Sequence, residues 1–474
     1  MVTDKKMNTK KLMTSGALYT LGNIFVQAIG FITLPIYTRV ISQEVFGEFS
    51  LFSSYMSIFM LIVGLQISGS LSTAKVKYGE EYDRYAVSAF HFSGLFAFSL
   101  LLLALLFRKL LGNLFGFSEQ VIVLLAVQTF NGYCSGFLGA YFIQKQESVA
   151  NFLLSFGSAI VNTVISIGLI TVMTDDFLAR VYGGVIPSSV LMIITVIYFQ
   201  RKKQPFFDKK YLSFMLMISL PLIFHQLGHL VLNQLDRIML GKMLSIKEVA
   251  IYSFGYTMGM IIQTVLNSIN MAWIPWFFEA KKKKDKRLHY YVLRYLALGL
   301  FLTLGYLTIF PDLALLMGGE KYSQSIDFIA MIIISYFFVF LYTFPVNIQF
   351  YYANTRMIPI GTIAAGVVNA ILNYFFIPKF GIYGAAVATV LSYLSLLVFH
   401  HIISRKRYQY DEVTVKVFLI FSLIAIGYAL LMNQFSDSLP IRWCLGIMVV
   451  IAYGVYFKTD VQALYQVIVR KKKE

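Results

Sequence analysis

The residues best suited to chemistry share one face of a long apolar segment near residues 211–240. Four of them recur at spacings of four, four and three, which places them on one side of a helix, and two more flank that side. Ionisable residues inside such a segment are costly, so each is a candidate for binding a polar substrate or relaying protons. The set comprises His225, Gln226, His229, Asn233, Asp236 and Arg237.

Simpler interpretations of these residues stay open. Each histidine could be an ordinary packed and hydrogen-bonded residue, and Asp236 could serve only to neutralise its neighbour Arg237. Arginines near the ends of apolar segments can also snorkel, extending their charge to the head-group region. The candidate substrate-binding residues are therefore taken together, from three segments: Gln27, Arg39, His225, His229, Asn233, Asp236, Arg237 and Arg294.

The composition predicts the kind of protein that positions these residues. Of 474 residues, 58% are hydrophobic and 13% are charged, and the mean hydropathy is +0.71. Soluble domains carry about 25% charged residues, so this is an all-α polytopic membrane protein. The net charge of +17 could suggest nucleic acid, but the basic residues lie in short loops between apolar segments. We therefore expect membrane lipids as partners and no nucleic acid.

Segments of about 20 apolar residues predict about 14 transmembrane helices. They form two sets of six, separated by a basic linker, and two further helices. The expected domains are 1–200, the cytoplasmic linker 201–210, 211–403 and 404–474. The predicted helices lie near 14–41, 46–73, 86–107, 119–143, 150–173, 178–199, 211–240, 249–278, 289–317, 326–352, 358–377, 381–403, 413–433 and 441–457.

The two sets of six helices echo each other in sequence. Residues 24–41 align without a gap on 222–239, so that Arg39 falls on Arg237, and VYGGVIPSSV (181–190) answers IYGAAVATVL (382–391). The echo predicts two pseudo-symmetric six-helix bundles, an architecture typical of secondary transporters with the substrate path between the halves.

Basic residues in the loops predict the orientation. If the N-terminus is cytoplasmic, 28 basic residues fall in inside segments and 8 in outside loops. This bias predicts an even number of spans with both termini in the cytoplasm. The outside loops are too short for a catalytic domain.

Several sequence patterns are missing. The chain has no GxxxxGK[ST], HExxH, CxxC or GxSxG motif, and its two cysteines, Cys134 and Cys444, lie in apolar stretches. We therefore expect no enzyme, no metal site and no cofactor. Energy for transport would come from an H⁺ or Na⁺ gradient, a coupled reaction, or the imbalance of the substrate itself.

Three stretches are similar to a known family: LPIYTRVISQEVFGEFSLF (34–52), NQLDRIMLGKMLSIKEVAIYSFGY (233–256) and NAILNYFFIPKFGIYGAAVATVLSYL (369–394). They resemble the bacterial polysaccharide (oligosaccharide-lipid) flippases of the multidrug/oligosaccharidyl-lipid/polysaccharide exporter superfamily. The likeness covers about 12 of the 14 spans. One departure is Ala250, where a glycine would match Gly47 of the first copy.

The resemblance implies flipping of undecaprenyl-diphosphate-linked repeat units to the outer leaflet of the bacterial cell membrane, for capsule, exopolysaccharide or O-antigen assembly. It implies the polysaccharide polymerase and assembly machinery as partners. Arginine suits a diphosphate because its planar fork binds phosphate oxygens bidentately. The alternatives are a lipid II-type flippase, a multidrug exporter of the same superfamily, and a membrane enzyme such as a polymerase.

Overall fold

The structure is a computed structural model that describes residues 9–408, 410 and 412–458. Helices account for nearly all of this part, and no strand occurs in it. Twelve helical segments within it are long and apolar enough to cross a membrane. One of them, α14 (Met357–Tyr408), contains two predicted spans, and α1 (Thr9–Val40) coincides with the first predicted span. The predicted all-α polytopic fold with about 14 transmembrane helices is confirmed.

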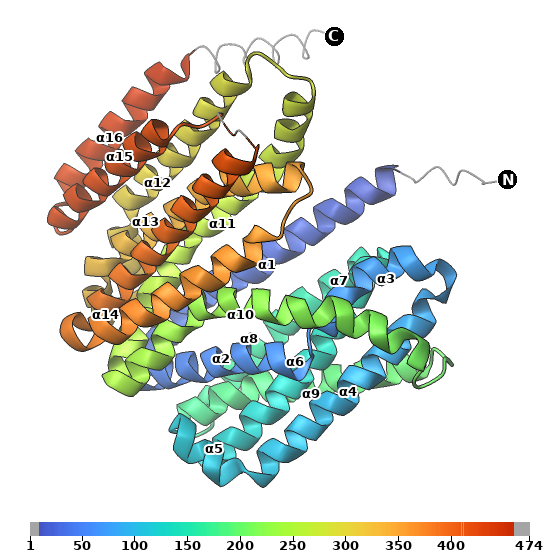
Figure 1. The fold of residues 1–474 in the computed structure, drawn as a ribbon. Helices are drawn as coiled ribbons and strands as arrows, with labels where there is room; N and C mark the ends of the chain where they lie inside the picture. The colour runs from blue at the N-terminus through green and yellow to red at the C-terminus, as the bar shows by residue number, and fades with distance from the viewer. Residues whose placement is uncertain (1–8, 409, 411, 459–474) are drawn as a thin grey trace, which may run out of the picture. The chain divides into compact units, whose positions relative to one another are not determined.

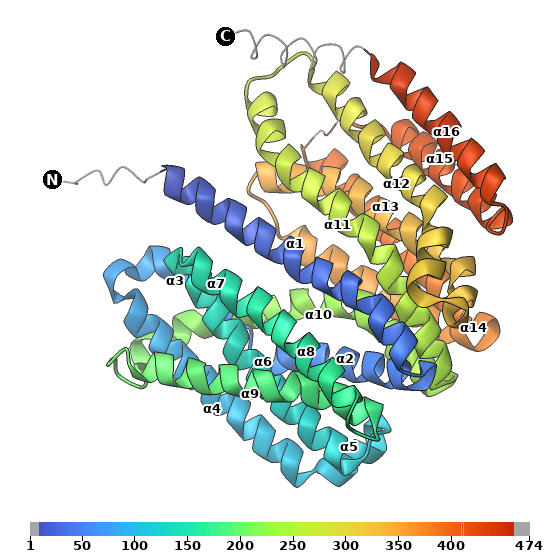
Figure 2. The same ribbon diagram turned by 180° about the vertical axis from the view of Figure 1, so that it is seen from behind.

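The chain divides into two compact units, residues 1–250 and 251–474. Figures 1 and 2 show the helices from opposite sides. The expected domain boundary at the linker 201–210 lies inside the first unit, so the helix that follows it, α10, packs with the first six spans. The helices of the first unit are α1 (Thr9–Val40), α2 (Gln43–Val63), α3 (Leu71–Tyr78), α4 (Tyr82–Leu106), α5 (Arg108–Phe115), α6 (Glu119–Lys145), α7 (Ser148–Phe152), α8 (Ser158–Ile170), α9 (Asp176–Gln200) and α10 (Leu212–Met243).

The second unit begins within α11. Its helices beyond the boundary include α13, which is almost completely buried and contacts α12, α14 and α15, and α16, which packs against α12. They are α11 (Ile246–Lys282), α12 (Leu288–Gly318), α13 (Ile326–Tyr351), α14 (Met357–Tyr408), α15 (Val415–Gln434) and α16 (Leu439–Tyr456).

Side-chain caps fix where several helices of the first unit begin. The Ser42 hydroxyl accepts a hydrogen bond from the Val45 amide, and Ser118 caps α6 in the same way. Asp175 caps α9 by accepting from the Leu178 amide. Such caps satisfy amide groups that have no partner within the helix, which matters most where little water is available.

Two predicted spans are interrupted. The span expected near 46–73 ends as α2 at Val63, because Leu65 and Gln66 adopt positive φ angles before a short 3₁₀ turn, η1 (Ile67–Ser70). Gly64 permits close packing there, since an added Cβ would lie 2.9 Å from the Tyr133 ring. The span near 150–173 contains a π-helical turn at Leu153–Gly157.

The long helix α14 bends at Gly381, which has φ 60° and ψ −138°. Only glycine adopts this conformation without steric cost. Three residues later, a Cβ on Gly384 would lie 2.4 Å from the carbonyl oxygen of Phe376. These two positions explain the spacing of glycines in the IPKFGIYGAA stretch: the bend joins two spans whose backbones approach closely.

Basic loops meet at one end of the first unit. Lys145, at the end of α6, lies 3.0 Å from a carboxylate oxygen of Asp83, at the start of α4, and Lys202 lies 3.7 Å from the other. Lys210 pairs with Glu81 at 2.7 Å. The loops predicted to be cytoplasmic in this unit therefore lie on a common side.

The second unit gathers its own basic loops. Lys281, in the last turn of α11, forms an ion pair with Glu412, which precedes α15. His289 at the start of α12 contacts the carbonyl oxygen of the same glutamate at 3.0 Å. The loops after α11 and α14, both predicted to be cytoplasmic, therefore lie together.

Candidate functional site

Helix α10 has a buried side and a polar exposed side. Leu232, Asp236 and Leu240, each four residues apart, are almost fully buried. This side packs against α2 and the 3₁₀ turn η1 in the first unit. Gln226 and His229 are exposed, and Asn233 is half-buried. The predicted polar set is therefore split between the two sides.

The exposed side carries a hydrogen-bonded ladder. The Asn233 Nδ2 donates to the His229 carbonyl oxygen at 2.7 Å and lies 3.1 Å from the His229 ring Nδ1. One turn later, the Arg237 guanidinium donates to the Asn233 carbonyl oxygen. The ladder fixes the Asn233 side chain while leaving it partly exposed.

The guanidinium of Arg237 is buried, with 7% of the residue exposed. It also donates to the Gln234 Oε1 at 3.1 Å, and that oxygen accepts from the Ser54 hydroxyl of α2 at 3.0 Å. Arg237 thus stabilises the contact between α10 and α2. Sequence reasoning missed Gln234 because it lies off the predicted face.

Arg39 and Gln27, the candidates on α1, are both exposed. Arg39 lies in the last turn of α1. This helix packs mainly against α7, the π-helical turn and α8, and contacts α2 less, whereas α2 is the main neighbour of α10. The side chain of His225 lies outside the described residues.

Arg294 lies in the second unit and has partners there. Its guanidinium is centred 4.1 Å from the Tyr456 ring and 5.0 Å from the Tyr290 ring, and it donates to the Tyr456 carbonyl oxygen. These contacts connect α12 to the end of α16, as expected of a cation at the end of a span.

Arg180, near the start of α9, contacts aromatic rings from two other helices. Its guanidinium is centred 3.8 Å from the Tyr37 ring of α1 and 4.1 Å from the Phe49 ring of α2. No spacing in the sequence brings these three positions together, because they come from three different helices.

The arrangement suits binding of a polar ligand more than covalent chemistry. Polar side chains exposed on a membrane helix are unfavourable against hydrocarbon, so the exposed side of α10 should face a water-filled or ligand-filled path. No group of three or more potential metal ligands occurs in the part of the chain that the structure describes.

Fold and site together define a polytopic helical transporter with polar residues inside its membrane spans. Residues 12–281 match the polysaccharide biosynthesis protein family, and residues 221–375 match the MatE family. The chain belongs to the polysaccharide biosynthesis protein family, within the MOP superfamily of flippases and exporters.

Two Haemophilus influenzae proteins are similar to most of the chain. The Lsg locus putative protein 1 is 23% identical over 73% of this chain and 87% of its own length. An uncharacterized membrane protein is 26% identical over 73% of this chain and 86% of its own.

Solved structures share the fold. The lipid II flippase MurJ, in an inward closed conformation, matches with a TM-score of 0.69 and 16% identity, over 94% of this chain and 100% of that one. A Vibrio cholerae MATE transporter matches with a TM-score of 0.57 and 14% identity, over 84% of this chain and 97% of that one.

Proposed function

We propose that this protein flips undecaprenyl-diphosphate-linked oligosaccharide repeat units from the inner to the outer leaflet of the bacterial cell membrane, for assembly of capsule, exopolysaccharide or O-antigen. The observation that carries the proposal is the polar exposed side of α10, where Gln226, His229 and Asn233 interrupt a membrane span. Membership of the polysaccharide biosynthesis family supports this class of substrate.

Each part of such a substrate has a suitable counterpart. The half-buried amide of Asn233 and the exposed amide of Gln27 would hydrogen-bond sugar hydroxyls, and the exposed guanidinium of Arg39 would bind the diphosphate. Buried Arg237 and Asp236 would support the site from behind, because neither exposes much surface. The lipid tail would stay in the bilayer while the polar head crosses.

Alternating access would move the head across the membrane. The prolines inside α1 and α10, Pro35 and Pro221, are the proposed hinges. Outward movement of a negative head group follows an inside-negative potential and gains roughly 2.3 kcal/mol per charge per 100 mV. Coupling to inward H⁺ or Na⁺ through Asp236, His225 or His229 is a further part of the proposal.

The proposed orientation has both termini in the cytoplasm. The basic loops predicted to be inside meet at one end of each unit, which supports this orientation. The flipped units would pass to a polysaccharide polymerase and its assembly partners on the outer side.

Transport into proteoliposomes tests the proposal. Purified protein should flip a fluorescent undecaprenyl-diphosphate oligosaccharide, and Asn233→Ala should slow flipping about tenfold, the equivalent of one hydrogen bond of about 1.4 kcal/mol. This substitution leaves the Asn233 carbonyl, and so its bond to Arg237, intact.

Met217→Ala is the matched control, because Met217 is exposed on α10 and apolar. It should flip at the wild-type rate. Flipping of lipid II in place of the oligosaccharide substrate would assign the protein to the other class of lipid-linked precursor. Export of cationic drugs without either activity would overturn the proposal.

A further inference from the structure

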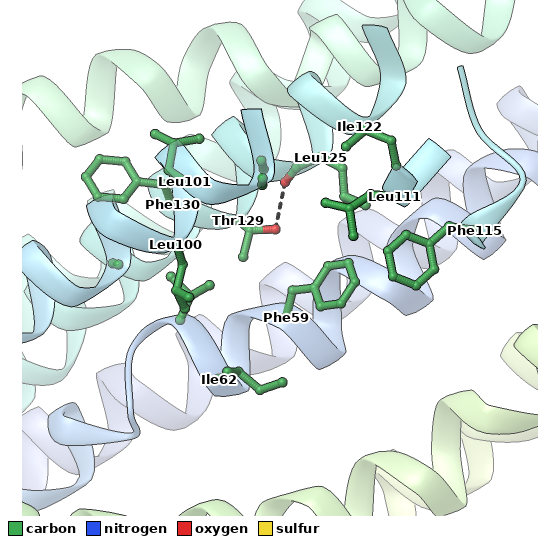
Figure 3. A pocket seen from close by; sticks show the side chains of 14 residues that line it. Phe59, Ile62, Leu100, Leu101, Leu111, Phe115, Ile122, Leu125, Thr129 and Phe130 are labelled. Atoms are coloured by element: carbon green, nitrogen blue, oxygen red, sulfur yellow. Dashed lines mark hydrogen bonds between the residues drawn. The ribbon is translucent and has the colours of Figure 1, made fainter. Parts of the chain in front are cut away.

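An apolar cavity lies inside the first unit, away from the polar side of α10. Its volume is about 220 Å³, and α2, α4, α5 and α6 supply its walls (Figure 3). Phe59 of α2, Ala104 of α4 and Phe115 of α5 are among the lining residues. The cavity belongs to one unit and is complete within it.

The cavity offers at most one hydrogen-bonding side chain to an occupant. Thr129 is its only lining residue with a polar side chain, and its hydroxyl donates to the Leu125 carbonyl oxygen at 2.7 Å, the bond drawn dashed in Figure 3. Water needs two or more polar partners to occupy such a space. An occupant must therefore be hydrocarbon.

The cavity continues toward the lipid-facing surface between α4 and α5. A second hollow of about 380 Å³ shares Leu100, Ala104 and Leu111 with the first. Its remaining lining residues include Phe107 and Leu110, which are 49% and 63% exposed. Since α4 crosses the membrane, this exposed apolar mouth opens to the bilayer, where lipid chains are the available hydrocarbon.

Helix α5 places positive charge beside that mouth. It begins with Arg108 and Lys109, directly before Leu110 and Leu111. Arg108 pairs with Glu119 at 2.8 Å, whereas exposed Lys109 forms no ion pair within the described part of the chain. A short helix with an apolar side toward the cavity and cations at its start suits the membrane interface.

We propose that this cavity is a binding site for an anionic membrane phospholipid. One acyl chain enters between α4 and α5 and fills the space beside Phe59 and Phe115. The phosphate lies at the start of α5, where Lys109 provides the complementary charge. The site is independent of the substrate proposed above.

Quenching by brominated lipid tests the site, because the three tryptophans of the chain (Trp273, Trp276 and Trp443) all lie in the second unit. Phe115→Trp puts a reporter at the cavity wall. The protein is placed in phosphatidylcholine vesicles with increasing amounts of chain-brominated phosphatidylglycerol. The fluorescence added by Trp at position 115 should be half-quenched at a mole fraction of brominated lipid about tenfold lower than for a lipid-facing reporter. That ratio is equivalent to a binding preference of about 1.4 kcal/mol. Leu102→Trp supplies the matched reporter, since Leu102 is 50% exposed on α4 and lines neither hollow.

Two further variants separate the chain from the head group. Ala104→Leu in the Phe115→Trp background should fill the space where the two hollows meet, since Ala104 lines both. Quenching should then no longer occur at the low mole fraction of brominated lipid. Lys109→Gln should remove the preference for brominated phosphatidylglycerol over brominated phosphatidylcholine. Identical quenching curves for the two reporters, in protein that elutes as a single species, would overturn the proposal and leave only bulk lipid contact.

Discussion

The two repeated helical corners in the first unit use the same sequence pattern for different purposes. The first joins α1 to α2 and the second joins α10 to α11, and a serine caps the second helix of each, Ser42 and Ser245. Yet Arg39 is exposed, while its counterpart Arg237 is buried and bonded toward α2. The scaffold of the corner is repeated, while one arginine is exposed and the other is buried and bonded toward α2.

The largest expected effect tests this division between the arginines. Arg237→Ala removes a buried charged donor and leaves the Gln234 side chain with only its hydrogen bond from the Ser54 hydroxyl. The free energy of unfolding should therefore fall by about 2–3 kcal/mol. The apparent melting midpoint of detergent-purified protein, followed by intrinsic fluorescence, should fall clearly. Arg39→Ala should lower that midpoint less, because Arg39 is exposed, and should slow flipping.

A different outcome would restore the simpler expectation from sequence, in which both arginines bind the diphosphate. If Arg237→Ala melts like the wild type and no longer flips substrate, its guanidinium contacts ligand in some state of the cycle. The comparison between the two corners would then be wrong for this pair.

A second difference between the corners concerns backbone packing. A Cβ on Gly47 would lie 2.2 Å from the carbonyl oxygen of Ile246, whereas its counterpart Ala250 is accommodated with no exposed surface. Gly47→Ala should therefore cost about 2 kcal/mol through overpacking, and Ala250→Gly about 1 kcal/mol through lost helix propensity. Melting midpoints of the two variants should fall in that order, and a harmless Gly47→Ala would contradict the close approach.

The sequence shows that Ala250 stands where the first copy has Gly47. It does not show why the two positions differ. The Gly47 backbone packs against Ile246, which lies 199 residues later in the chain. Hydropathy and the repeat predicted the spans, because length and apolar composition are properties of each segment. The burial of Arg237, the break after Val63 and the Gln234 link depend on packing between segments, which no local pattern encodes.

The predicted polar face shows the same limit. Spacings of three and four place its members on one side of a helix, yet Asp236 is buried and His229 exposed. The side chains span an arc wide enough to cross the boundary between core and surface. The structure therefore separates the predicted face into exposed residues and buried ones, which the spacing alone did not distinguish.

The smallest expected effect concerns Arg180, near the start of α9. Arg180 of the first copy aligns with Gly381 of the second, where α14 bends and no side chain is present. Arg180 contacts Tyr37 and Phe49, so it stabilises the α1–α2 corner. Arg180→Lys keeps the charge but loses the planar stacking, and should cost about 0.5–1 kcal/mol.

A double-mutant cycle isolates this contact. Arg180→Lys and Tyr37→Leu, alone and combined, should show a coupling of about 0.5 kcal/mol in stability, because each removes the same stacked pair. Additive effects would mean that Arg180 acts through its charge alone. The α1–α2 corner would then be stabilised by apolar packing and the Ser42 cap. It would differ from the α10–α11 corner only in the exposure of Arg39 compared with that of Arg237.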